Sequence, residues 1–314
     1  MNLFYYKTKA PSSNFGDELN PWLWPRLLPF LDSGGAAKSE TIFVGIGTVL
    51  NDTAPERVKK AKTVVFFSTG AGYGLSLRQR CSPNWKIYCV RGPLSAQRLK
   101  LPRSAAITDG AVLLKRFFQP VTVAERSPHF SYMPHFRHGN PQLFKAVCQR
   151  VGLKFIDPAE PVENIITDIS RSRGLISEAM HGAIVADTLR VPWLPVRTSP
   201  KILPFKWKDW CASIDLPYRY RLIRGAKSLS TQDCLYPLRP YLQRQASTAN
   251  LFEGITLNRF SYPYEKTLDW IGHQLDALTQ KTFYLSSDAV LESRVAQLEE
   301  RLEHLRQDAK ASRL

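Results

Sequence analysis

GLISEAMHGAIVADTLRVPWLPV, residues 174–196, contains a strand, a helix and a second strand in direct succession. Gly174 to Ile176 and Val191 to Val196 are short and apolar, which is typical of buried strands. Glu178 to Leu189 lies between them and has the length of a helix. Strands joined in this way pair in parallel within one sheet. The segment therefore predicts an α/β fold and places His181 in the first turn of a helix.

The same alternation extends from this unit toward the N-terminus. Short apolar runs recur between segments with helical character, which indicates crossover units and mainly parallel sheets. The expected strands are Asn2 to Tyr6, Thr41 to Val44, Thr63 to Phe67, Lys86 to Val90, His129 to Met133 and Lys154 to Ile156. The expected helices are Glu18 to Leu31, Gly92 to Leu99, Gln142 to Val151 and Val162 to Ser170.

A polar stretch with a proline at residues 119–126 interrupts this pattern and predicts a domain boundary. We expect two Rossmann-like domains, residues 1–120 and 127–215, followed by a mostly helical extension at 216–314 that packs back across the first domain. The last helix has a short coiled-coil spacing, so it is expected either to pack internally or to form a homodimer. The residues of this seam are Leu291, Val295, Leu298, Leu302 and Leu305.

The composition limits the class of protein. The chain has 314 residues, 44% of them hydrophobic, which is enough for two buried cores. Its 43 Lys and Arg against 27 Asp and Glu give a net charge of +16, which attracts phosphates, carboxylates, nucleic acid or anionic lipid. No nucleic-acid-binding module is recognisable, so we expect no nucleic-acid partner.

The remaining composition favours a cytoplasmic protein. The five cysteines show no metal-ligand spacing, which favours reduced thiols and no bound metal. The N-terminus resembles no signal peptide, and charges or prolines interrupt every apolar stretch before it could span a membrane. Any membrane contact is therefore expected to be peripheral, with the basic and aromatic stretch Tyr218 to Arg224 against the anionic inner face.

Polar groups follow several expected strands, where ligands bind in open α/β sheets. After the first strand, Asn14, Gly16 and Asp17 are suited to an approaching ligand, although capping of the next helix explains them equally well. Gly47 and Gly72 follow two further strands in glycine-rich turns that lack the dinucleotide-binding pattern.

Charged residues follow the later strands. Arg91 ends a strand, where its guanidinium is suited to a carboxylate or phosphate. Asp109 is interpreted as a turn residue. His135 and Arg137 follow the first strand of the second domain, and His181 is placed as a proton donor at a helix N-terminus.

Four ordered motifs resemble the polysaccharide pyruvyltransferase family: NFGDEL at 14–19, VRGPLS at 90–95, ITDGAVLL at 107–114 and ISEAMHGAIVAD at 176–187. The similarity is greatest to bacterial ketal pyruvyltransferases of the succinoglycan and xanthan type, and it covers roughly the first 215 residues. It implies a GT-B-like arrangement in which phosphoenolpyruvate and an acceptor sugar, carried on a lipid-linked oligosaccharide, meet in a cleft between two domains. It implies neither cofactor nor obligatory metal.

The resemblance also implies roles for individual residues. Arg91 matches the family's donor-binding arginine, His181 its motif histidine, and Lys206 is similar to its late lysine. Many members have an arginine two positions before the histidine, where this chain has Ala179. The corresponding donor contacts are therefore expected from Arg137 or Arg197.

The chemistry requires a general acid and several fixed cations. We predict His181 as the acid and Asp17 or His135 as the base. Two alternatives stay open: a nucleotide-sugar glycosyltransferase on the same architecture, and a basic membrane-binding or nucleic-acid-binding protein without catalysis. The sugar and the pair of hydroxyls that is bridged do not follow from these patterns.

Overall fold

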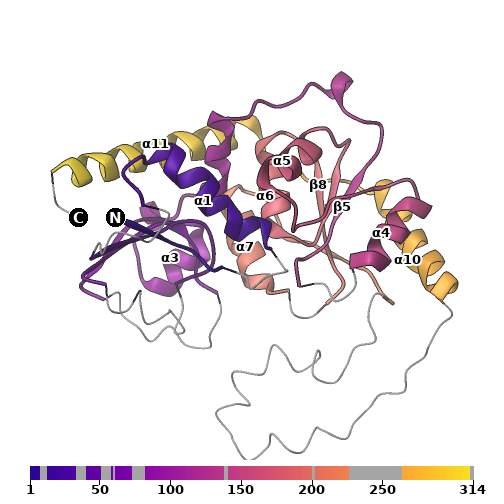
Figure 1. Ribbon diagram of the computed structural model, residues 1–314, viewed down its shortest axis with the longest axis horizontal. Coiled ribbons are helices and arrows are strands. Elements are labelled where there is room, and N and C mark those ends of the chain that lie inside the picture. Colours follow the sequence, from indigo (N-terminus) through magenta and orange to yellow (C-terminus); the bar gives the residue numbers. More distant parts are fainter. Residues whose placement is uncertain are drawn as a thin grey trace, which may run out of the picture.

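The computed structural model describes residues 1–7, 13–32, 40–50, 58, 61–72, 82–137, 141–199, 202–225 and 264–311. Within these ranges the chain forms two parallel sheets with helices packed around and between them (Figure 1). The predicted boundary segment 119–126 contains the short 3-10 helix η3 (Val123–Glu125), which lies between the last strand of the first sheet and the first strand of the second.

The first sheet has the strand order β1-β2-β3-β4, and all three neighbouring pairs are parallel. Its strands are β1 (Asn2–Phe4), β2 (Thr41–Val44), β3 (Thr63–Thr69) and β4 (Trp85–Val90). Its helices are α1 (Phe15–Leu27), α3 (Pro93–Leu99), η1 (Arg103–Ala105) and η2 (Gly110–Arg116). The sequence-based strands are confirmed here, with ends shifted by at most two residues.

The second sheet has the order β6-β5-β7-β8-β9 and is also parallel throughout. Its strands are β5 (Ser131–Met133), β6 (Lys154–Phe155), β7 (Leu175–Ser177), β8 (Trp193–Arg197) and β9 (Arg221–Leu222). Its helices are α4 (Pro141–Arg150), α5 (Val162–Ser170), α6 (Met180–Thr188) and α7 (Pro204–Ser213). The predicted unit at 174–196 is β7-α6-β8, and His181 lies in the first turn of α6 as expected.

Helix α1 differs most from its predicted range, because it begins at Phe15 and ends at Leu27, with two prolines inside it. Proline 21 has no N–H to donate to the carbonyl of Asp17, one helical turn earlier. The side-chain amide of Asn20 donates to that carbonyl at 3.1 Å and so replaces the missing bond. Because α1 starts right after Asn14, Gly16 and Asp17 lie in its first turn.

A second difference concerns the segment before Asp109, since the sequence also predicts a strand that ends at Thr108 to Ala111. Here the structure has an isolated bridge between Val90 and Ala106, and η2 follows directly. The Asp109 side chain accepts a hydrogen bond from Ala111 N and caps η2. The turn interpretation of Asp109 therefore agrees with its backbone position.

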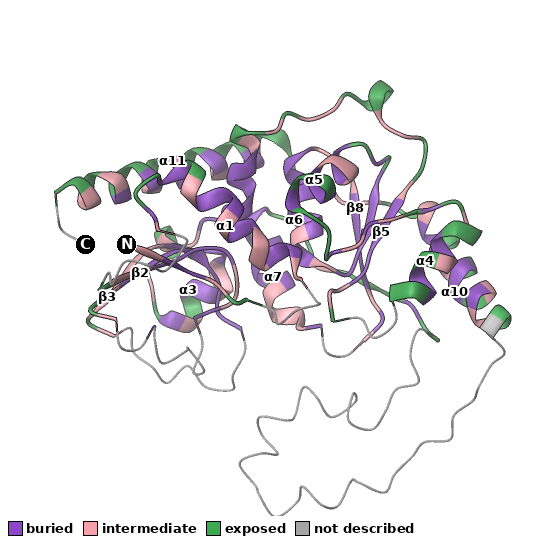
Figure 2. Cartoon of the chain, viewed as in Figure 1, coloured by how far each residue is buried: buried purple, intermediate pink, exposed green. Residues whose placement is uncertain are grey.

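Helix α6 lies at the centre of the molecule, in contact with α1, α5, η2, β7 and β8. Ala183, Ile184, Val185 and Ala186 are each 0% exposed, and almost the whole helix is buried in Figure 2. A helix that is apolar all round is typical of such a position. One hydrophobic cluster runs from α1 through α6 to α7, so the core is continuous from the first sheet to the second.

Within residues 264–311 the chain forms two helices, α10 (Tyr264–Thr279) and α11 (Asp288–Lys310). Helix α11 contacts β4 and η2, as predicted for an extension across the first domain, whereas α10 contacts α4 beside the second sheet. The prediction is wrong for α10, because Leu268, Ile271 and Leu275 complete the apolar cluster of α4. The coiled-coil seam of α11 is buried within this chain, so it packs internally. The homodimer stays a prediction.

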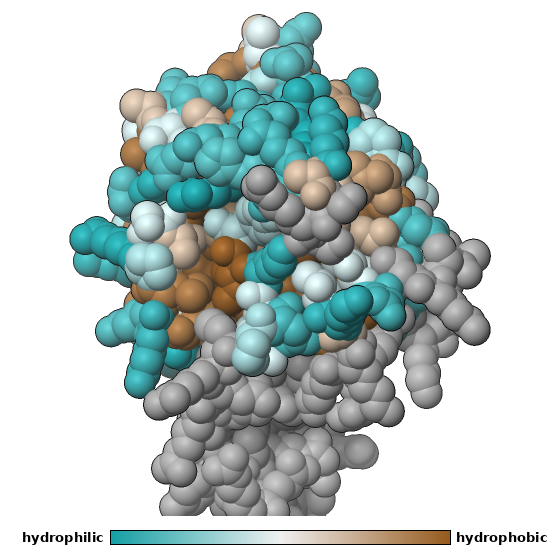
Figure 3. Space-filling view, turned by 90° about the vertical axis from the view of Figure 1, so that its left-hand side faces the viewer, coloured by the Kyte–Doolittle hydropathy of each residue, from teal (hydrophilic) through white to brown (hydrophobic). Residues whose placement is uncertain are grey.

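Viewed from the end that carries the first sheet, hydrophilic side chains cover most of the described surface and surround a hydrophobic area (Figure 3). No helix in the described part of the chain is long and apolar enough to cross a membrane.

Candidate active site

Helices α1 and α6 meet at their N-termini, where Gly16 lies against His181. A Cβ atom at residue 16 would lie 1.9 Å from His181 Nδ1 and 2.7 Å from Cε1. Real Cβ atoms do not approach other atoms so closely, so only glycine fits between α1 and the imidazole. This contact places the NFGDEL and ISEAMHG motifs side by side.

Replacing Gly16 with alanine is therefore expected to displace the His181 ring rather than to unfold the helix, because alanine is the better helix former. We expect turnover to fall by about tenfold or more, which corresponds to a loss of about 1.4 kcal/mol in transition-state stabilisation. Steady-state kinetics combined with thermal unfolding would check this. A variant with full activity, or one with proportionate loss of folded protein, would contradict it.

His181 also faces a buried carboxylate, Asp109. Its Nε2 lies 3.6 Å from Asp109 Oδ2, with the Asp109 side chain 0% and the His181 side chain 16% exposed. Neither atom has a hydrogen-bond partner among the described residues. Catalytic hydrogen bonds are often long before substrate binds, so this pair has the geometry of a histidine held by a carboxylate.

Asp17 follows Gly16 in the first turn of α1. Asn14 Nδ2 donates to its Oδ2 at 2.7 Å, so Asn14 stands at the N-cap position but orients Asp17 instead of capping the helix. Burial raises the pKa of Asp17, while the Asn14 hydrogen bond and the charges of His181, Lys206 and Arg137 lower it and only partly offset the effect of burial. The pKa of this one carboxyl group is therefore lowered by four predicted site residues, although burial has the larger effect.

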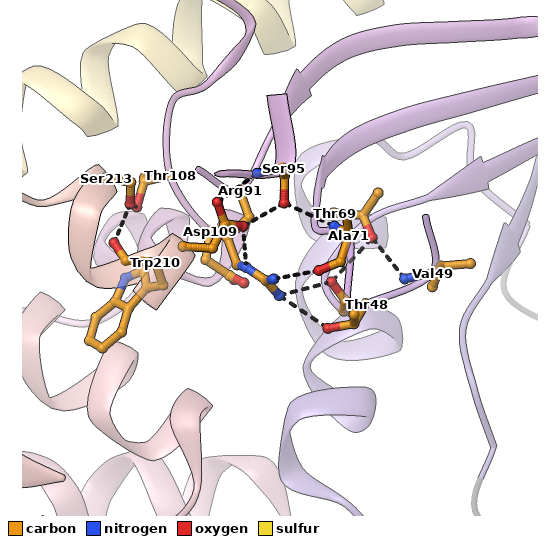
Figure 4. A network of polar contacts seen from close by, with 12 residues as sticks. Thr48, Val49, Thr69, Ala71, Arg91, Ser95, Thr108, Asp109, Trp210 and Ser213 are labelled. Atoms are coloured by element: carbon orange, nitrogen blue, oxygen red, sulfur yellow. Dashed lines mark hydrogen bonds and ion pairs between the residues drawn. The ribbon is translucent and has the colours of Figure 1, made fainter. Parts of the chain in front are cut away.

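Arg91 occupies a different environment from the one its motif suggested. Its side chain is 0% exposed, and its Nε lies 3.1 Å from Asp209 Oδ2 in α7, which is also 0% exposed. Figure 4 shows the guanidinium of Arg91 directed toward Thr48 and Ala71. Its Nη1 donates to Thr48 Oγ1 and its Nη2 to Ala71 O, both at 3.1 Å. All three guanidinium nitrogens are thus occupied by the protein, so Arg91 joins the strand ends of the first sheet to α7.

The glycine-rich turns surround this guanidinium. A Cβ at Gly70 would lie 2.2 Å from Arg91 Cζ, and the Gly47 carbonyl accepts from Arg91 Nη1 at 3.4 Å. Gly47 has φ of +133°, a conformation that side chains rarely adopt. Gly72 lies close to Thr48 and Leu203. These glycines accommodate the arginine and the neighbouring loops.

Glu178 connects the strand ends of the second sheet. It is fully buried, burial raises its pKa, and it accepts hydrogen bonds from the backbone N–H groups of His135 and Thr198. The His135 ring accepts from Arg137 N at 3.2 Å, so the loop after β5 is ordered around it. Glu178 therefore positions the loops that follow β5 and β8.

Sequence reasoning missed three acidic residues of this site, namely Asp109 as the partner of His181, Asp209 and Glu178. Asp209 lies far along the chain from Arg91 and could not be assigned from spacing. Glu178 lies three residues before His181 within the quoted motif, and its burial follows from the buried ends of β7 and α6.

The described residues contain no cluster of His, Cys, Asp or Glu that could hold a metal ion. Cys89, Cys148 and Cys211 are free and buried, and burial raises the pKa of Cys89 and Cys148 to about 12. These thiols are therefore protonated at neutral pH. Cys81 and Cys234 lie outside the described residues, as does His138.

A parallel α/β fold with a histidine that faces a buried carboxylate is suited to catalysis, and comparison with known proteins identifies the class. Residues 53–200 match the family of polysaccharide pyruvyl transferases. The match includes Arg91, Asp109 and His181, whereas Asp17 and Lys206 lie outside it.

The chain is 37% identical over 220 residues to the succinoglycan biosynthesis protein ExoV of Rhizobium meliloti strain 1021. The similar region covers 69% of this chain and 67% of that protein. The chain therefore belongs to the polysaccharide pyruvyl transferase family and is a pyruvyltransferase enzyme.

Proposed function

We propose that this enzyme transfers the pyruvyl group of phosphoenolpyruvate to a sugar of a lipid-linked oligosaccharide and forms a pyruvate ketal during exopolysaccharide synthesis. The observation that carries the proposal is the position of His181, which packs against Gly16 of α1 and faces the buried carboxylate of Asp109 at 3.6 Å. The charges of Lys206 and Arg137 lower the pKa of the neighbouring Asp17. Phosphoenolpyruvate carries a phosphate and a carboxylate, so its site requires several cations beside an acid. The relative ExoV, named for succinoglycan biosynthesis, supports an exopolysaccharide acceptor.

In this proposal Lys206 and Arg137 bind the donor, because they are not fully buried and their charges act at Asp17. Arg91 acts indirectly, since its guanidinium is fully buried and bonded to protein atoms. It fixes the loops after β2 and β3 against α7, the helix that carries Lys206. The donor-binding role implied by the family resemblance is thus reassigned from contact to positioning.

His181 supplies the proton. It protonates the methylene carbon of phosphoenolpyruvate, which becomes a methyl group and leaves C2 electron-deficient for attack by one sugar hydroxyl. Phosphate leaves with the C2–O bond electrons, and a second hydroxyl of the same sugar attacks C2 and closes the ketal. One hydroxyl proton restores His181 and the other leaves with phosphate, so the products are ketal and inorganic phosphate.

Asp109 and Asp17 have separate roles in this scheme. Asp109 holds the imidazole in position. Asp17, which follows Gly16 in the chain, accepts the proton of the first attacking hydroxyl and passes it to the departing phosphate. His135 is the alternative base, but its ring is ordered by the Arg137 backbone and its own N–H is bound to Glu178.

Donor choice tests the proposal. Purified enzyme is incubated with an oligosaccharide-lipid extract and either phosphoenolpyruvate or a set of nucleotide sugars, and release of phosphate or nucleoside diphosphate is measured. Phosphate release that requires both phosphoenolpyruvate and the extract supports the proposal. Release of nucleoside diphosphate with no response to phosphoenolpyruvate would establish the glycosyltransferase alternative.

The raised pKa of Asp17 gives a prediction about pH. An acid whose pKa is higher in the folded than in the unfolded state lowers stability as pH rises from about 3.9, the usual value for Asp, through the folded-state pKa. Asp17→Asn is therefore expected to increase the free energy of unfolding at pH 7, to have little effect near pH 4, and to abolish most activity. Urea unfolding at both pH values checks this, and a variant that is destabilised at pH 7 would contradict it.

A further inference from the structure

The residues that follow α7 form the edge of the second sheet next to β8. Val196 pairs with Arg221 and Arg197 with Leu222. Ile223 and Val196 pack into the cluster of α4 and α10 on one face of the sheet. Because side chains alternate along a strand, Arg197 and Leu222 belong to the opposite face, on which α7 lies.

A row of aromatic rings leads outward on this face. Trp207 of α7 stacks on Tyr218 with ring centroids 5.4 Å apart and an angle of 19°, and Tyr218 contacts Tyr220 at 5.6 Å and 34°. Trp207 is 0% exposed, whereas Tyr220 is 40% exposed. The row therefore holds a partly exposed phenol ring in a fixed position at the surface.

Polar atoms beside these rings form no hydrogen bond with the described residues. The Arg197 guanidinium lies 4.7 Å from the centre of the Tyr220 ring. Arg197 Nε and the Tyr218 hydroxyl are buried and have no hydrogen-bond partner among the described residues. Buried polar groups are nearly always paired in native proteins, so two unpaired groups beside an exposed ring indicate a place for a polar ligand.

This place adjoins the residues assigned above. Trp207 directly follows Lys206, whose positive charge partly offsets the effect of burial on the pKa of Asp17. The charge of Arg197 partly offsets the effect of burial on the pKa of Glu178. Thr198, the residue after Arg197, donates its backbone N–H to Glu178, which lies three residues before His181 in the chain. The end of β8 that carries Arg197 is therefore connected to the proposed site.

We propose that Tyr220, Tyr218 and Arg197 form a subsite for a pyranose ring of the acceptor, which rests on the proposed function. The C–H face of the sugar packs on the exposed Tyr220 ring, and its hydroxyls accept hydrogen bonds from the partly exposed Arg197 guanidinium beside that ring. Leu222, which is 56% exposed, extends the apolar surface. Sugar sites combine an apolar wall with a few such polar groups. The sequence-based assignment of Tyr218 to Arg224 to a membrane surface stays a separate prediction.

The test compares Tyr220→Leu, Tyr220→Phe and Arg197→Gln with a matched control, Tyr6→Leu. Tyr6 is 39% exposed and contacts Phe4, so it reproduces the loss of an exposed, ring-packed tyrosine elsewhere. Acceptor KM, kcat and phosphoenolpyruvate KM are measured for each folded variant. We expect Tyr220→Leu and Arg197→Gln to raise acceptor KM by about tenfold. Phosphoenolpyruvate KM is expected to change little, and Tyr220→Phe and Tyr6→Leu to resemble wild type.

Unchanged acceptor KM in Tyr220→Leu, or an equal rise in both KM values, would overturn the subsite. Loss of binding to vesicles of anionic phospholipid with unchanged acceptor KM would assign the surface to membrane and also overturn it. Calorimetric titration of delipidated acceptor oligosaccharide into wild type and Tyr220→Leu tests the subsite independently of the proposed pyruvyl transfer. Weaker binding to the variant supports the subsite even if wild type transfers no pyruvyl group, whereas equal binding overturns it.

Discussion

Replacing His181 with glutamine is expected to lower kcat for phosphate release by about 10²–10⁴-fold, the usual contribution of a positioned general acid. Glutamine keeps polarity and similar size but cannot donate a proton to carbon. The acceptor KM is expected to stay within about threefold, because the lost interaction acts in the transition state. Steady-state assay of acceptor-dependent phosphate release measures both quantities.

Asp109→Asn provides the matched control for this result. It retains the cap on η2, which uses Asp109 Oδ1 and Ala111 N, but removes the charge that faces His181 at 3.6 Å. We expect a loss of about tenfold or more in kcat, and no further loss when it is combined with His181→Gln. Full additivity of the two substitutions, or His181→Gln within tenfold of wild type, would show that the pair does not act as one unit.

Arg91→Ala is expected to have the largest effect on stability. Removing one partner of a buried ion pair leaves the other charge buried and unpaired, which costs about 3–5 kcal/mol. Here the unpaired group would be Asp209, whose side chain is 0% exposed and also accepts a hydrogen bond from Ser95 N at 2.9 Å. Urea unfolding at pH 7 gives the free energy directly.

The surface pair of Lys62 and Glu40 supplies the comparison, because its side chains are 77% and 70% exposed. Lys62→Ala is expected to cost less than about 1 kcal/mol. If Arg91 bound phosphoenolpyruvate directly, Arg91→Ala would instead leave stability near that of Lys62→Ala and raise the donor KM. That outcome would support direct donor binding by Arg91, as the family resemblance implies.

Local patterns predicted most of the fold, because strand and helix periodicities are properties of neighbouring residues. Helix α5 has the predicted bounds, and His181 lies in the predicted first turn. The coiled-coil spacing of α11 predicted its buried face but did not decide between internal packing and dimerisation. The packing of helix α10 was predicted wrongly, because it depends on the apolar face of α4, which is distant in the sequence.

The site was predicted in part for a similar reason. The sequence predicted roles for Asp17 and His181, and the structure brings Gly16, the neighbour of Asp17, against His181. It did not indicate that Arg91 is buried against Asp209, which is distant in sequence. It interpreted Asp109 as a turn residue only, although the same carboxylate caps η2 and faces His181. A motif indicates candidate site residues, whereas burial and partners far away in the sequence decide which of these side chains are free to touch a substrate.

The most direct measurement is transfer of carbon from phosphoenolpyruvate labelled with ¹³C at C2 to the oligosaccharide-lipid extract, followed by NMR of the purified saccharide. The proposed mechanism predicts a labelled quaternary ketal carbon bonded to two sugar oxygens, formed by wild type and at most in traces by His181→Gln. Label that remains in free pyruvate or phosphoenolpyruvate while the acceptor gains an unlabelled sugar from a nucleotide donor would contradict it.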